Sequence, residues 1–187
     1  MNDQQQPLIQ IRDLSVTYHT RLGDLSAVQG VSFDVQRGEI LGLVGESGCG
    51  KSTLGKALLR MIAPPGEISG GQIIFDGKDI MTYDERRLRE FRGKAASMIF
   101  QDPMTSLNPV QRIDEHVVEA IRVHERETAR ESALERVRGL AERLGIQSRR
   151  LTDYPHQLSG GMRQRVMIAL GPDDAGKEVG YLAPVEP

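Results

Sequence analysis

The chain has 187 residues, which is enough for one domain with a hydrophobic core, or one domain and a small lobe. Its 24 Lys and Arg residues nearly balance its 26 Asp and Glu residues, so no net positive field marks a nucleic-acid-binding protein. The single cysteine excludes an internal disulfide framework and suits a reducing compartment. The polar N-terminal residues lack the form of a signal peptide, and no apolar run approaches the roughly 20 residues of a membrane span. These features predict a soluble cytoplasmic protein, which reaches a membrane only through a partner.

The first part of the chain has the pattern of β-strands. Alternating apolar positions and β-branched residues predict strands over 8–14 and 15–18, and another over 27–35. The short apolar run 39–44 predicts a buried strand. The chain therefore opens with antiparallel β-structure and not with a plain strand–helix–strand unit.

A glycine-rich loop follows and closes on a lysine and two hydroxyl residues. It consists of Gly45, Glu46, Ser47, Gly48, Cys49, Gly50, Lys51, Ser52 and Thr53, which fit the pattern G-x-x-x-x-G-K-[ST]. The apolar spacing after it predicts a helix over 54–62. A glycine turn beside an ordinary helix is the alternative, but a chance match at four fixed positions occurs in roughly one chain per hundred. Strand, glycine loop and helix in this order are what a phosphate-binding loop requires.

The chemistry of such a loop is direct. Glycines allow successive N–H groups to point into one concavity, and the helix that follows adds the positive end of its dipole. We expect Lys51 to reach the β- and γ-phosphates of a nucleotide, and the Ser52 hydroxyl to hold Mg²⁺. This stretch by itself favours nucleotide binding.

The middle of the chain alternates strands and short helices. Pro64 and Pro65 end the helix that begins at the loop, because proline cannot continue it. A strand and turn are predicted over 70–77, and a short basic helix over 84–92, whose arginines 86, 87, 89 and 92 we expect on a solvated face. A buried strand over 97–100 leads into Gln101.

From residue 102 the pattern becomes helical. Four-residue spacing predicts a helix over 113–124, and a capping box from Thr128 to Glu131 opens another that Gly145 ends. A hydroxyl and two glycines then precede a helix that continues to 170, and this is a second potential anion site. These residues are Leu158, Ser159, Gly160, Gly161 and Met162, with Gln164 two positions on. Alone, the group is also an ordinary helix cap.

The histidines give no metal-site pattern. His19, His116, His124 and His156 have no acidic or cysteine neighbours at ligand spacing, so we expect them to face solvent.

The ordered set of motifs resembles the ATP-binding subunits of ABC transporters. The set is the phosphate loop, Gln101 after a buried strand, a helical insert, and the Leu-Ser-Gly-Gly group. The stretches 44–52, 98–110 and 154–169 look like the oligopeptide, dipeptide, glutathione and nickel importers. The resemblance covers about residues 8–170. It implies an α/β fold, a P-loop NTPase of the ABC type, with an N-terminal antiparallel β lobe and a helical lobe over about 102–165.

The resemblance also implies roles, cofactors and partners. ATP and Mg²⁺ would be the cofactors, with Tyr18 stacked on adenine and Gln101 in contact with Mg²⁺; otherwise Tyr18 is a plain strand aromatic and Gln101 a polar strand end. Residues 158–162 and Gln164 would contact the ATP of a second ATP-binding subunit, in a homodimer or heterodimer. Transmembrane permease subunits would hold the protein peripherally at the inner face of the cell membrane.

The sequence departs from the family pattern after Leu170. Family members continue into an apolar strand that ends in the Walker B acidic residues, and later reach a switch histidine. Residues 171–187 are rich in glycine, proline and scattered charges, which do not predict a buried strand. We therefore expect a core that lacks its C-terminal part, and a disordered or non-family tail over 171–187. No catalytic carboxylate is identifiable, so nucleotide binding is expected, with hydrolysis by the chain alone poor or absent.

Three functions follow from these observations. The first is an ATP-binding subunit that energises ABC-type import of peptides or related small solutes. The second is a truncated nucleotide-binding remnant that does not hydrolyse ATP. The third is a soluble ABC ATPase, against which the importer-like stretch 98–110 argues.

Overall fold

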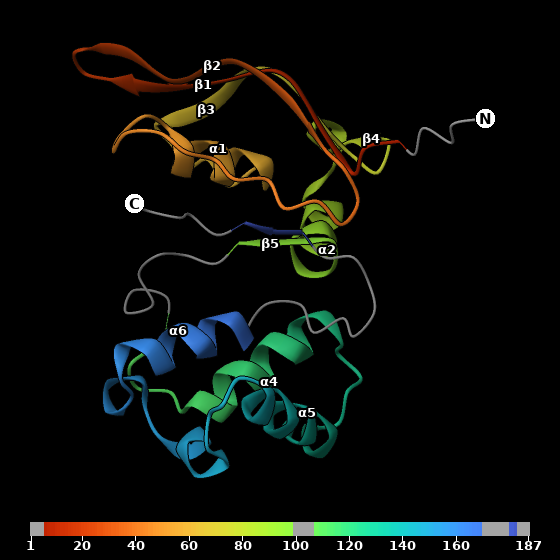
Figure 1. The fold of residues 1–187 in the computed structure, drawn as a ribbon, viewed down its shortest axis with the longest axis vertical. Coiled ribbons are helices and arrows are strands. Elements are labelled where there is room, and N and C mark those ends of the chain that lie inside the picture. The colour runs from red at the N-terminus through yellow and green to blue at the C-terminus, as the bar shows by residue number, and fades with distance from the viewer. Residues whose placement is uncertain (1–5, 99–106, 170–179, 183–187) are drawn as a thin grey trace. The chain divides into compact units, whose positions relative to one another are not determined.

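A four-stranded antiparallel sheet organises the N-terminal part of the chain (Figure 1). The computed structural model describes residues 6–98, 107–169 and 180–182, which form two units that divide between Arg92 and Gly93. The sheet belongs to the first unit and has the strand order β2-β1-β3-β4. Its strands are β1 (Ile9–Thr20), β2 (Gly23–Val35), β3 (Gly66–Phe75) and β4 (Lys78–Asp79). The predicted antiparallel opening is confirmed, with 8–14 and 15–18 joined into one strand.

Helix α1 (Lys51–Leu58) packs against β1 and β2. Its buried side chains, Leu54, Ala57 and Leu58, belong to the same apolar core as buried residues of β1 such as Ile11 and Val16. The helix starts at Lys51, three residues before the predicted start at 54, and it ends before residue 62, because Arg60 has a positive φ of 50°. Helical φ values are negative, so this residue terminates the helix.

The end of α1 is fastened by arginine side chains. Arg92, from α2 (Glu85–Lys94), donates to the carbonyl oxygen of Leu59 at 2.8 Å and also to that of Arg60. The Arg60 guanidinium in turn donates to the carbonyl oxygens of Ile80 and Tyr83, in and just after the 3₁₀ turn η1 (Ile80–Thr82). The prediction that Arg92 lies on a solvated helix face is therefore wrong, because these carbonyls need donors that the helix itself does not supply.

The apolar run before the glycine loop is not a buried strand. Residues 39–44 pair with no strand among the described residues, and Ile40 and Val44 are 97% and 93% exposed. A buried parallel strand requires hydrogen-bonded neighbours on both sides. Since the described part of the chain brings no such neighbour to this run, the prediction is wrong.

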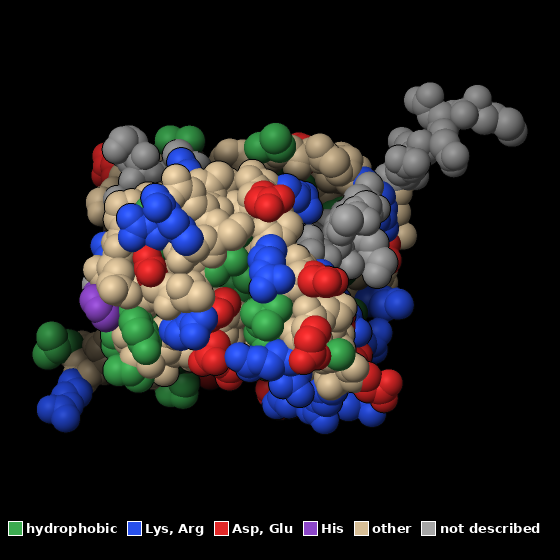
Figure 2. All heavy atoms as spheres, turned by 90° about the horizontal axis from the view of Figure 1, so that it is seen from below, with side chains coloured by type: hydrophobic (Ala, Val, Ile, Leu, Met, Phe, Trp, Pro, Cys, Tyr) green, Lys and Arg blue, Asp and Glu red, His purple; other side chains and the backbone are tan. Residues whose placement is uncertain are grey.

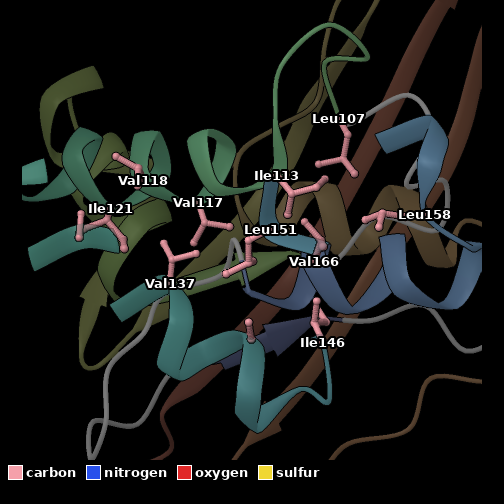
Figure 3. Close-up of a cluster of buried hydrophobic side chains, with 12 residues drawn as sticks. Leu107, Ile113, Val117, Val118, Ile121, Val137, Ile146, Leu151, Leu158 and Val166 are labelled. Carbon is pink, nitrogen blue, oxygen red and sulfur yellow. The ribbon is translucent and has the colours of Figure 1, made fainter. Parts of the chain in front are cut away.

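In the described part of the second unit, three helices pack around one apolar cluster (Figure 3). They are α4 (Ile113–His124), α5 (Arg130–Arg143) and α6 (Gly160–Ala169), joined through the 3₁₀ turns η2 (Ser148–Thr152) and η3 (Pro155–Gln157). The cluster consists of Leu107, Ile113, Val117, Val118, Ile121, Ala133, Val137, Ala141, Ile146, Leu151, Leu158 and Val166. Burial of each large aliphatic side chain contributes about 1.5–3 kcal/mol. The cluster is therefore the main source of stability for this unit, and the predicted helix 113–124 is confirmed.

The two ends of α5 differ in how well they were predicted. Its N-cap is Ala129, which makes no side-chain cap, and the Thr128 hydroxyl donates to Glu125 Oε2 at 3.0 Å. The predicted capping box is therefore wrong, because the preceding turn offers this hydroxyl a carboxylate. The predicted stop at Gly145 is confirmed by its φ of 67°, which glycine adopts without strain.

A short parallel pair completes the second unit. Strand β5 (Ala96–Met98) pairs with β6 (Gly180–Leu182). These three C-terminal residues differ from the irregular tail that the composition predicts, because main-chain pairing with β5 does not depend on an apolar run. Residues 99 and 100 of the predicted strand, and 171–179 and 183–187 of the predicted tail, lie outside the described residues.

Charged side chains of both signs lie next to one another on the face drawn in Figure 2, in keeping with the near balance of acidic and basic residues. Among the helices that the structure describes, none has the length and apolar composition needed to cross a membrane.

Candidate nucleotide-binding site

The glycine loop turns tightly between β2 and α1. Gly48 and Gly50 have φ values of 81° and 94°, and the Cys49 N–H donates to the Glu46 carbonyl at 3.3 Å. Gly50 also lies directly against β2, since an ideal Cβ placed on it would lie 2.3 Å from the carbonyl oxygen of Ala27. Glycine is therefore required at Gly50 for two reasons, its dihedral angle and its close approach to β2.

Lys51 lies over this loop. Its Nζ donates to the carbonyl oxygens of Gly45 at 2.6 Å and Glu46 at 2.8 Å, and lies 3.8 Å from Cys49 Sγ. The lysine is half-buried and the cysteine is exposed. The loop thus holds one positive charge among main-chain groups, at the position where the sequence predicts contact with phosphates.

The N-terminus of α1 adds unpaired donors to the same place. The first intrahelical hydrogen bond runs from the Leu54 N–H to the Gly50 carbonyl at 2.8 Å. The N–H groups of Lys51, Ser52 and Thr53 precede it and have no intrahelical acceptor. The first turn of α1, which is described in full, contains no acidic residue. Together these donors and the helix dipole favour an anionic ligand, and the exposed Ser52 hydroxyl is available to a cation bound with it.

Tyr18 lies in the same unit, near the end of β1. It pairs with Leu25 of β2 and Gly66 of β3, and its ring packs so closely on Gly66 that a Cβ there would lie 2.5 Å from Cε1. The ring is half-buried, so part of it faces solvent. This position suits the predicted contact with a base, since aromatic faces stack on any base.

The second predicted anion site lies in the other unit, at the start of α6. Leu158 is buried in the apolar cluster, whereas Ser159, Gly160 and Gly161 are exposed. The Ser159 Oγ accepts a hydrogen bond from the Met162 N–H at 3.4 Å, so the serine caps the helix. Gln164 is exposed on the first turns of α6 and Met162 is half-buried. The motif is therefore presented at the surface by a leucine anchored in the core.

Sequence reasoning missed a residue that supports this motif. The Arg163 guanidinium donates to the carbonyl oxygens of Leu158 at 2.9 Å and Pro155 at 3.3 Å. These bonds fix the chain just before Ser159. No periodicity identifies such a contact, because the arginine acts on main-chain groups of the loop that precedes its own helix.

Gln101, the remaining predicted site residue, lies outside the described residues.

Two histidines have partners that the sequence did not predict. His19 is exposed as predicted, but its ring faces Asp24 and Glu67, which the sequence did not indicate as neighbours. His116 is half-buried, and its Nε2 accepts from the Asn108 N–H at 2.9 Å. His156 is exposed as predicted, with its ring stacked on Tyr154, and the side chain of His124 is not described. Within the described part of the chain, no group of His, Cys, Asp and Glu side chains is arranged to hold a metal ion.

A glycine loop that closes on a lysine at a helix N-terminus defines the P-loop class of nucleotide-binding proteins. The family model described as ABC transporter matches residues 28–171. The chain therefore belongs to the ABC transporter family, and the predicted resemblance is confirmed.

The most similar proteins include peptide transport subunits. The chain is 42% identical to the oligopeptide transport ATP-binding protein OppD of Bacillus subtilis over 166 residues, which cover 87% of this chain and 46% of that protein. It is 45% identical to OppD of Escherichia coli over 164 residues, which cover 87% of this chain and 48% of that protein. The chain thus spans about half the length of these curated relatives.

Solved structures share the fold. The dimeric structure of a bacterial ABC transporter cassette matches with a TM-score of 0.76 at 25% identity, covering 87% of this chain and 68% of that chain. A post-hydrolysis state of an ATP-binding cassette, bound to ADP and phosphate, also matches with a TM-score of 0.76, at 24% identity. The predicted fold class, an ABC-type P-loop NTPase with an antiparallel β lobe, is confirmed.

Proposed function

We propose that this chain binds MgATP as the ATP-binding subunit of an ABC importer for peptides or related small solutes. The observation that carries the proposal is the Lys51 ammonium, which lies over a glycine loop at a helix N-terminus without acidic residues in its first turn. An anionic triphosphate suits such a site, because the ammonium and the main-chain N–H groups are all donors. The names of the relatives, oligopeptide transport ATP-binding proteins, support peptides as the class of solute.

Each predicted site residue has a role in this proposal. Residues 45–53 surround the phosphates, and Lys51 neutralises part of their charge. The Ser52 hydroxyl and Gln101 hold Mg²⁺, which when bound would neutralise further charge on the phosphate oxygens. Tyr18 supports the base. The proposal covers binding and not hydrolysis by the isolated chain, because no carboxylate in it is assigned the role of catalytic base.

The exposed motif on α6 would serve a second subunit. We place Ser159, Gly160, Gly161 and Gln164 against the ATP of a partner domain, with Leu158 and Met162 holding the motif in the helical unit. The dimeric cassette among the solved structures supports this arrangement. Permease subunits would bind the assembly and keep it at the inner face of the membrane.

Substitution of the lysine tests the binding site. Lys51→Ala removes an ammonium whose hydrogen bonds to a charged ligand are each worth about 1.5–3 kcal/mol. We expect MgATP to bind roughly ten- to a hundredfold more weakly in isothermal titration calorimetry. Lys56→Ala, in the last turn of the same helix, is the matched control and should bind as the parent does. Equal affinity of Lys51→Ala and the parent would refute the proposal.

The dimer requires its own experiment. Sedimentation of the chain with a full-length relative should show an MgATP-dependent complex that Ser159→Arg weakens, since the arginine would fill the space of the partner's phosphates. If the amount of complex changes neither with MgATP nor with Ser159→Arg, the role assigned to the motif is contradicted.

A further inference from the structure

One histidine joins three strands at the end of the sheet that carries Tyr18. His19 Nδ1 lies 2.8 Å from Asp24 Oδ1 of β2, and its Nε2 lies 3.2 Å from Glu67 Oε1 of β3. The main-chain N–H of His19 donates to the Pro65 carbonyl oxygen at 2.9 Å. We call His19, Asp24 and Glu67 the His19 clamp.

The carboxylates of the clamp lie next in sequence to the two cross-strand partners of Tyr18. Tyr18 pairs with Leu25 and Gly66, and the two clamp carboxylates belong to the residues adjacent to these, Asp24 and Glu67. Side chains alternate along a strand, so the clamp and the tyrosine occupy opposite faces of the same strand ends. The clamp therefore holds together the main chain on which the Tyr18 ring packs, while leaving the face of the ring untouched.

The clamp is complete only when the imidazole carries a positive charge. Both of its nitrogens face ionised carboxylates, which only accept hydrogen bonds, so two bonds require two N–H donors. Neutral imidazole has one N–H, and its other nitrogen would direct a lone pair at a carboxylate. The charged groups that face the ring are Asp24 and Glu67, one from each neighbouring strand. They raise the pKa of His19 above its ordinary value of 6.5, chiefly through the hydrogen bond to Asp24 and next through that to Glu67.

We propose that His19 is a positioning residue for the base of the nucleotide. In its protonated form, His19 holds together the strand ends around Tyr18, and this keeps the tyrosine ring in position for the base. This inference rests on the proposed function, because it assumes that Tyr18 supports the base. Because the pKa of His19 is raised, the protonated imidazole stabilises the clamp fully below about pH 6.5. This stabilisation is lost as the pH rises through the raised pKa of His19. Base recognition is therefore tighter at mildly acidic pH than at alkaline pH.

The experiment separates the base from the phosphates. The affinities of the parent and of His19→Gln are measured by calorimetry for ATP and for inorganic triphosphate, at about pH 6 and about pH 8. Glutamine spans the same space but does not gain a charge, and it leaves one of the two carboxylates without a donor. His156→Gln is the matched control, since it changes an exposed histidine that stacks on Tyr154. The comparison at each pH cancels the titration of ATP itself.

We expect the parent to bind ATP about two- to fivefold more tightly than His19→Gln at the lower pH, and this ratio to become smaller at the higher pH. The modest size follows from the 51% exposure of the His19 side chain. Triphosphate should bind the two proteins equally at both values. A ratio for ATP that does not change with pH, or an equal change for triphosphate, overturns the inference.

The same titrations include Lys51→Ala. Loss of both ligands by Lys51→Ala, together with an unchanging His19→Gln ratio, rejects the role of His19 and leaves the proposed function standing. Retention of ATP by Lys51→Ala rejects the proposed function and, with it, the role of His19.

Discussion

Gly50→Ala tests how closely the loop must approach the sheet. Two penalties are expected at this position. The φ of 94° is a left-handed conformation, which a residue with a Cβ adopts at a cost of about 1–2 kcal/mol. The new Cβ would also lie 2.3 Å from the Ala27 oxygen, whereas real Cβ contacts are essentially never shorter than 3.0 Å, so loop and strand would separate by about 0.7 Å. Overpacking of this kind costs a further 1–3 kcal/mol, roughly.

Gly48→Ala is the matched control for this substitution. Gly48 has a similar φ of 81°, but a Cβ there meets nothing within 4 Å. It should therefore carry the conformational penalty alone, about 1–2 kcal/mol, against about 2–5 kcal/mol for Gly50→Ala. Urea denaturation followed by circular dichroism measures the two free energies of unfolding, and calorimetry measures MgATP binding. Identical unfolding midpoints and affinities for the two variants would show that the contact with Ala27 does not matter.

Three further predictions concern a thiol, the core and an ion pair. Because Cys49 is exposed in the loop, N-ethylmaleimide should modify it and abolish MgATP binding, and prior MgATP should slow the modification measured by mass spectrometry; a modified protein with unchanged affinity would contradict this. Ile113→Ala, at a fully buried position, should lower the free energy of unfolding by about 2–5 kcal/mol, whereas Val123→Ala, at a half-exposed position, should change it by less than about 0.5 kcal/mol in urea titrations. The Arg136 hydrogen bond is the chief cause of the lowered pKa of Glu125, so this pair stabilises the fold above the ordinary carboxyl pKa and the contribution is lost as pH falls through the lowered value. Arg136→Gln should therefore weaken the acid dependence of thermal unfolding, and an unchanged dependence would count against the pair.

Local patterns predicted much of the structure. The glycine loop and the spacing of Ile113, Val117 and Ile121 are short-range signals, since the residues that determine them are within a few turns of one another. The helix stop at Gly145 is equally local, because it depends on one dihedral angle. The fold class and the phosphate loop could therefore be recognised from the sequence.

What the sequence did not predict depends on pairing between distant segments. The run 39–44 has the composition of a buried strand, but a strand forms only where a neighbour supplies its hydrogen bonds. The contacts of His19 require the registers of two different strand pairs, and Glu67 is far along the chain from it. The bonds from Arg92 to the end of α1 likewise depend on how α2 docks. Neither composition nor periodicity contains these registers.

The arginine contacts at the C-terminal end of α1 neutralise the negative end of its helix dipole and leave the positive end without such a partner in the first turn. The guanidinium of Arg92 offsets the negative pole of the helix at Leu59 and Arg60, whereas the first turn at the opposite pole contains no acidic residue. A phosphate bound as proposed would therefore meet the positive pole of a helix whose negative pole is already neutralised and whose C-terminal end is held by hydrogen bonds. In the proposed site, the hydrogen bonds of Arg92 at the C-terminal end of α1 would thus contribute to phosphate binding at the other end of the helix.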